Sequence, residues 1–98
     1  MNLYVIRRPS GWRTPEDLEA GAARSKQVGD EEMSGDIRWI RSYVVREADG
    51  GLGTFCIYQA SSVEKIREHA ARAGIPVTDI FEVAETVIVR PDPVAVEA

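Results

Sequence analysis

A strand, a capped helix and a second strand follow one another between residues 54 and 89, and this succession restricts the fold more than any other part of the chain. The helix, at residues 62–74, begins where Ser61 and Glu64 have the spacing of a capping box. Apolar residues recur in it at intervals of three and four, which is typical of one buried helical face. Gly74 favours the left-handed conformation that ends a helix. We therefore expect strands at residues 54–60 and 79–89 around this helix.

Two further strands and a helix are expected before this stretch. Residues 3–6 are rich in β-formers and predict a strand, which Pro9 ends. Arg7 and Arg8 are then interpreted as a solvated strand end. Thr14, Pro15 and two acids favour a helix from about Pro15, and the segment at 29–32 either ends it or adds an irregular turn. The alternation at 36–46, followed by Asp49-Gly50-Gly51, indicates a long strand that forms an antiparallel hairpin with residues 54–60.

The resulting order, β-α-β-β-α-β, predicts a ferredoxin-like α+β fold, with a four-stranded antiparallel sheet and two helices on one face. Residues 1–89 would form this single domain, and residues 90–98 an extended C-terminal tail. Simple alternation places Trp39, Arg41 and Tyr43 on one strand face, which we assign to the uncovered side of the sheet. Large side chains there usually mark an interface. We expect a homodimer of the dimeric α+β barrel type, formed sheet to sheet around a ligand cavity.

Composition argues against several classes of partner. The formal net charge is −4 and the isoelectric point about 5.0, so no basic surface for nucleic acid or an anionic membrane is expected. One cysteine cannot form an internal disulfide. No signal peptide and no apolar run of transmembrane length is apparent. The expected location is therefore cytoplasmic, with no nucleic-acid or membrane partner.

Cys56 and His69 are the single cysteine and the single histidine of the chain. A thiol beside an imidazole can act as a nucleophile with its base, or as two ligands of nickel or copper. The competing interpretation is that Cys56 is a small buried hydrophobe and His69 a hydrogen-bonded boundary residue on the helix flank. No zinc-type spacing is present, so a metal ion would need ligands from distant segments or from two subunits.

Arg41, with aromatic residues two positions away on each side, predicts a second kind of site. Its charge, together with stacking, can hold an anionic and partly aromatic ligand. The alternative is that the guanidinium lies in solvent, or pairs across the dimer with an acid such as Glu82 or Glu85. The candidate ligand-binding residues are Trp39, Arg41, Tyr43 and Tyr58.

Three segments form a distinctive set: residues 36–44, residues 55–60, and Ile66-Arg67-Glu68-His69-Ala70 followed by Gly74 and Pro76. Together they resemble the successive signatures of a small bacterial family of unknown function that includes a nickel-binding protein. The resemblance extends over the opening strand and the Thr14-Pro15 helix start, and so covers residues 1 to about 89. It implies a dimeric ferredoxin-like fold and a transition metal such as nickel, with Cys56 and His69 as candidate metal ligands.

Three functions stay open at this point. The first is a small dimeric binding protein for a transition metal or a small ligand. The second is a cofactor-independent α+β-barrel enzyme acting on a hydrophobic small molecule, with His69 as base, Cys56 lining the pocket and the Arg41 group orienting substrate. The third is a structural dimer module.

Overall fold

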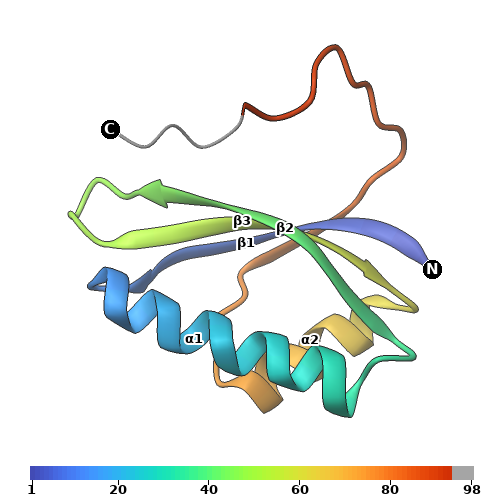
Figure 1. The fold of residues 1–98 in the computed structure, drawn as a ribbon, viewed down its shortest axis with the longest axis horizontal. Coiled ribbons are helices and arrows are strands. Elements are labelled where there is room, and N and C mark those ends of the chain that lie inside the picture. Colours follow the sequence, from blue (N-terminus) through green and yellow to red (C-terminus); the bar gives the residue numbers. More distant parts are fainter. Residues whose placement is uncertain (94–98) are drawn as a thin grey trace.

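The computed structural model describes residues 1–93 and has the expected β-α-β-β-α-β order (Figure 1). The elements are β1 (Asn2–Trp12), α1 (Pro15–Gln27), the π-helical turn η1 (Val28–Glu32), β2 (Ile37–Arg46), β3 (Leu52–Ala60), α2 (Val63–Ala73) and β4 (Asp79–Glu82). The strands form one antiparallel sheet in the order β2-β3-β1-β4. Both helices cover one side of it, and the chain after β4 passes over the other side. The ferredoxin-like α+β fold is therefore confirmed.

Helix α1 begins as its sequence predicts. Thr14 is the N-cap, and its Oγ1 accepts a hydrogen bond from the amide of Asp17 at 3.1 Å. At the other end the chain passes directly into η1, where the amide of Met33 donates to the carbonyl of Val28 at 3.0 Å. Of the two alternatives for residues 29–32, the irregular turn is the one that forms.

Helix α2 begins one residue later than the capping-box pattern indicates. The N-cap is Ser62, whose Oγ accepts from the amide of Lys65 at 3.2 Å. Ser61 instead donates from its hydroxyl to Asp36 Oδ1 at 2.8 Å, and so ties the helix start to the chain before β2. Gly74 ends the helix at a φ of 68°, as predicted.

The outer strands differ from the predicted lengths. β1 continues through Pro9 to Trp12, with a register irregularity between Arg8 and Trp12. β4 ends at Glu82 instead of residue 89, and one more hydrogen bond follows, from the amide of Val83 to the carbonyl of Leu3. β4 runs antiparallel to β1, and its last ladder pair is Glu82 with Tyr4, two residues after the start of β1 at Asn2.

A bulge at Ile40 changes which side chains share a face of β2. Trp39 and Arg41 pair with adjacent residues of β3, Tyr58 and Ile57, so one residue of β2 is extra. The extra residue shifts the alternation by one. The predicted common face for Trp39, Arg41 and Tyr43 is therefore wrong. Trp39 packs against the core on the helix side, whereas the open side carries Arg41 and Tyr43.

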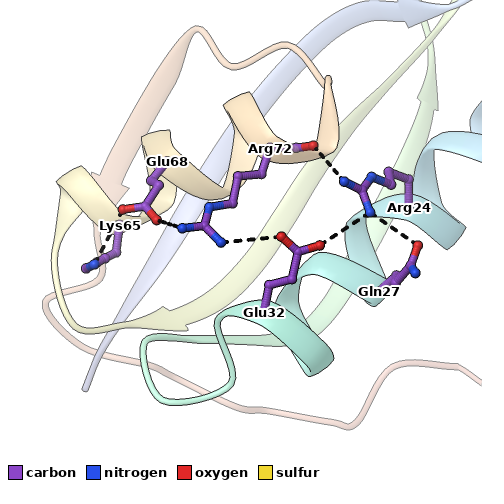
Figure 2. A network of polar contacts seen from close by, with 6 residues as sticks. All are labelled: Arg24, Gln27, Glu32, Lys65, Glu68 and Arg72. Atoms are coloured by element: carbon purple, nitrogen blue, oxygen red, sulfur yellow. Dashed lines mark hydrogen bonds and ion pairs between the residues drawn. The ribbon is translucent and has the colours of Figure 1, made fainter.

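The core lies between the sheet and the two helices, and its largest fully buried side chains include Ile6, Val28, Tyr58, Ile66 and His69. A polar network joins the helices above it (Figure 2). Glu32 of η1 lies 3.4 Å from Arg24 of α1 and 3.3 Å from Arg72 of α2. Such half-exposed pairs contribute little free energy each, although they link η1 to both helices.

The chain after β4 follows the open side of the sheet (Figure 1). Its apolar residues Val87, Ile88 and Val89 are 81%, 73% and 80% exposed. The predicted tail, residues 90–98, is described as far as residue 93, and its remainder lies outside the described residues. Within residues 1–93, no helix has both the length and the apolar character needed to cross a membrane.

Candidate functional site

A cavity of about 200 Å³ lies between α1 and the helix side of the sheet. Its wall is mostly apolar and includes both tryptophans of the chain, Trp12 and Trp39. Leu18 and Ala22 contribute from α1, and Val44 and Cys56 from the sheet. A side chain at Gly21 would collide with the indole of Trp12, because its Cβ would lie 2.6 Å from Nε1. The helix and the end of β1 thus approach each other closely at this wall.

Arg8 brings a charge into the cavity wall. The residue is only 1% exposed, and its Nη1 donates to the carbonyl of Pro76 at 2.7 Å. The guanidinium carbon lies 5.8 Å from the centre of the Tyr58 ring. Nη2 has no hydrogen-bond partner among residues 1–93, and no carboxylate of that part of the chain pairs with Arg8. The interpretation of Arg8 as a solvated strand end is therefore wrong.

A strand that ends at Pro9 leaves Arg8 in solvent, so this boundary is the reason that the sequence does not indicate its burial. The signal that identifies it is the alternation of β1, in which Tyr4, Ile6 and Arg8 are the buried positions. Once β1 continues to Trp12, Arg8 has to point to the same side of the sheet as Ile6.

A chain of buried polar groups runs from the cavity wall to α2. The Tyr58 hydroxyl lies 2.9 Å from Ser25 Oγ, which in turn lies 3.4 Å from His69 Nε2. His69 Nε2 also donates to the Ser25 carbonyl at 3.0 Å. Burial raises the pKa of Tyr58, so the phenol keeps its proton.

His69 is fully buried, so the prediction of a boundary position is wrong. Burial lowers its pKa below the ordinary 6.5, and the positive charge of Arg8 acts in the same direction. The imidazole is therefore neutral near pH 7, with its proton on Nε2 facing the Ser25 carbonyl. Nδ1 has no partner within the described part of the chain.

Cys56 and His69 lie on the helix side of the sheet, but no hydrogen bond among residues 1–93 joins them. Cys56 lines the cavity and belongs to the core, and its thiol donates to Thr54 Oγ1 at 3.2 Å. Both side chains are buried beneath the helices, so neither reaches the open face where a cavity between two sheets would form.

The residues present do not fit a metal ion within one chain. No three histidine, cysteine or acidic side chains gather at one point among residues 1–93. Structural metal sites need about four such ligands, and catalytic ones about three. The charge of Arg8, close enough to His69 to lower its pKa, would also oppose a cation beside that imidazole.

Two of the predicted ligand-binding residues, Arg41 and Tyr43, meet on the open side beneath the C-terminal segment. Arg41 Nη1 lies 2.9 Å from Asp92 Oδ2, and the Tyr43 hydroxyl donates to the two oxygens of Asp92 at 2.9 and 2.8 Å. These bonds, from Tyr43 first and Arg41 second, hold the pKa of Asp92 below its usual range. The acid that pairs with Arg41 is thus within the same chain. A groove of about 520 Å³ lies between this segment and the sheet.

The other two predicted ligand-binding residues, Trp39 and Tyr58, lie on the opposite side of the sheet. Their rings stack with centroids 6.0 Å apart, and both line the cavity under α1. Trp39 Nε1 donates to Ser42 Oγ at 2.8 Å. The four residues therefore form two separate pairs, one on each side.

Comparisons with known proteins agree with this fold. The model of the family described as nickel responsive protein SCO4226-like matches residues 4–83, so the chain belongs to that family. Among solved structures, SCO4226 from Streptomyces coelicolor A3(2) is similar, with a TM-score of 0.69 and 17% sequence identity. The similarity covers 87% of this chain and 99% of that one, and at this identity it shows the fold alone. No curated protein matches the chain.

Proposed function

We propose that this member of the SCO4226-like family is a non-catalytic binding protein that holds a small organic molecule between α1 and the sheet. The supporting observation is a cavity with largely apolar walls and one buried guanidinium, that of Arg8, whose Nη2 has no partner among residues 1–93. Ligand sites commonly combine apolar walls with a few polar groups that fix orientation. An uncompensated buried charge costs free energy, which a suitable ligand would recover.

Two contacts argue for binding over catalysis. His69 directs its Nε2 proton to the Ser25 carbonyl and is absent from the cavity wall. The Cys56 thiol donates to Thr54 and has no base as partner among the described residues. A nucleophile and its general base need to lie within hydrogen-bond distance of each other, and no hydrogen bond joins Cys56 and His69 among residues 1–93.

Tryptophan fluorescence tests this proposal directly, because both tryptophans line the cavity. A ligand that enters should change the emission of the untagged protein, and native mass spectrometry should detect it as added mass. Ala22→Leu fills the cavity and should abolish both signals. Ala23→Leu adds the same side chain to an exposed position of α1 and serves as control. Ligand signals that survive Ala22→Leu unchanged would place binding outside the cavity and refute the proposal.

Transition-metal binding is a second candidate, favoured by the nickel-responsive description of the family. Because one chain gathers no set of three ligands within residues 1–93, such a site would draw ligands from two subunits. Elemental analysis of untagged protein after incubation with nickel tests it. Stoichiometric nickel lost in Cys56→Ser or His69→Gln would support those donors. Nickel retained by both variants would exclude them, and protein without nickel would refute this candidate.

We also propose that the protein is a homodimer formed through the open side of the sheet. Phe81 is 57% exposed there, and Val87, Ile88 and Val89 of the C-terminal segment are exposed as well. Apolar residues gathered in this way commonly mark an interface. Phe81→Asp should shift the mass measured by sedimentation from dimer to monomer. Ala23→Asp, on the opposite side of the molecule, should leave the dimer intact, and a monomeric wild-type protein would refute the proposal.

A further inference from the structure

We propose that the ligand of the α1 cavity carries a carboxylate that pairs with the guanidinium of Arg8. This inference rests on the proposed binding function and specifies the class of ligand: small monocarboxylic acids with an apolar body. It concerns residues on the helix side of the sheet and is independent of any metal site.

The charge of Arg8 is the first reason. A guanidinium stays protonated in proteins, so burying it to 1% exposure places a permanent positive charge in the cavity wall. Its Nη1 donates to the neutral carbonyl of Pro76, and its Nη2 has no hydrogen-bond partner among residues 1–93. The two Nη groups of arginine lie in one plane and match the two oxygens of a carboxylate.

The adjacent residue shows what the chain does with an arginine that it neutralises itself. Arg7 points to the open side, and its Nη2 donates to both oxygens of Glu47 at 2.8 and 2.9 Å. The ring of Phe55 lies 4.6 Å from its guanidinium carbon. Its Nη1 lacks a hydrogen bond, as Nη2 of Arg8 does, but its charge is paired. Arg8 has the deeper burial, and no carboxylate among residues 1–93 pairs with it.

The hydroxyl groups that line the cavity already have hydrogen-bond partners. The hydroxyls of Ser25 and Tyr58 bond to each other, Ser42 accepts from Trp39, and Thr54 accepts from Cys56. A ligand therefore needs one anionic acceptor group and otherwise apolar surface, which disfavours sugars, polyols and cations.

Glu19 is the carboxylate of this chain that would compete with an anionic ligand for Arg8. It is an exposed residue of α1 that lines the cavity, and it forms no ion pair within the described part of the chain. Its negative charge would repel an anion that enters the cavity. Glu19→Gln should therefore leave carboxylate affinity unchanged or raise it.

The volume limits the body of the ligand. An apolar cavity of about 150 Å³ is known to bind benzene. The cavity of about 200 Å³ thus accommodates one ring, or a short branched chain, together with a carboxylate. The aliphatic side chains of Leu18 and Val44 and the stacked rings of Trp39 and Tyr58 provide the apolar contact.

The experiment compares probes of similar shape and different charge on the untagged full chain: benzoate, benzamide and benzylamine, with 3-methylbutanoate and its amide as the aliphatic pair. Tryptophan fluorescence gives each Kd. At least one acid should bind about ten- to a hundredfold more tightly than its amide, because a hydrogen bond to a charged group replaces one to a neutral group. Benzylamine should bind most weakly. Inorganic phosphate is included to test whether any anion suffices.

Arg8→Met keeps the length of the side chain and removes its charge, so it should make acid and amide bind equally. Arg38→Met removes the same charge from an exposed position of β2 and should preserve the preference. If Arg8→Met does not fold, the acid and amide series on the wild-type protein decides by itself.

Each alternative outcome is distinct. Equal affinity of acids and amides would overturn the carboxylate inference and leave the cavity as a binding site. Phosphate displacing benzoate with equal affinity would also overturn it, since an anion without an apolar body would then suffice. No response to any probe, in the wild type as in Ala22→Leu, would overturn the cavity function together with the inference.

Discussion

Arg8 and Arg41 lie on opposite sides of the same sheet, and their surroundings differ in nearly every respect. Arg41 is half-exposed and is paired by Asp92 from the C-terminal segment. Arg8 is buried beneath the helices, with no carboxylate among residues 1–93. Water screens a charge on the open side, so an ion pair there adds little to the free energy of unfolding. On the helix side an unpaired charge lowers stability, so keeping one there is better explained by recognition than by folding.

The largest effect should come from the core on the helix side. Ile6→Ala removes a fully buried side chain and should lower the free energy of unfolding by about 2–5 kcal/mol. Val5→Ala, the adjacent position facing the open side, should cost clearly less because its side chain is only half-buried. Urea denaturation followed by circular dichroism measures both. Equal losses would mean that the open side is covered as completely as the core.

A second comparison concerns the two arginines. Arg8→Met should raise the free energy of unfolding by about 1–3 kcal/mol, because it removes a buried charge without a counter-ion and keeps the packed chain length. Arg41→Met should produce no measurable change in the same denaturation experiment, since its ion pair is exposed. A less stable Arg8→Met protein would show that the bond to Pro76 outweighs the cost of the charge.

The buried hydroxyl chain should show a smaller effect. Tyr58→Phe removes the bond to Ser25 and should cost about 1 kcal/mol, while Ser25 can still bond to His69. On the open side, Tyr43→Phe removes an exposed bond to Asp92 and should cost less. Thermal unfolding of the two variants in parallel tests which one loses more stability. A larger loss in Tyr43→Phe than in Tyr58→Phe would contradict the expected difference between the two sides of the sheet.

The smallest effect concerns pH. The folded-state pKa of His69 is below the ordinary 6.5, so below that pH the unfolded chain binds a proton that the folded chain does not. Stability should therefore fall as pH is lowered from about 7 through 6.5 towards the folded-state pKa. The His69→Gln variant should lack this part of the slope. The idea fails if unfolding midpoints of the two proteins change in parallel between pH 7 and 5.

Local sequence signals were sufficient for the order of elements, because Thr14, Gly74 and the Asp49-Gly50-Gly51 turn act through the backbone beside them. The ends of the strands depend on partners instead. β4 stops at Glu82, opposite Tyr4 of β1, and nothing in residues 83–89 themselves signals that stop.

The site was harder to anticipate for the same physical reason. A single extra residue, Ile40, reverses the faces of half of β2 and separates Arg41 from Trp39. Cys56 and His69 are each the single residue of their type, but shared rarity carries no information about the distance between them. Arg8 is identified only when β1 is known to pass through Pro9.

Gly21 has a consequence for anyone who would stabilise this protein. Glycine within a helix costs about 1 kcal/mol relative to alanine, so Gly21→Ala is an obvious candidate for a more stable variant. Yet the added methyl group would lie 2.6 Å from Trp12 Nε1 and would displace the indole that forms one wall of the cavity. This clash offsets the gain in stability that alanine would bring, and the same methyl group alters a wall of the cavity, so both packing and ligand capacity favour glycine at this position.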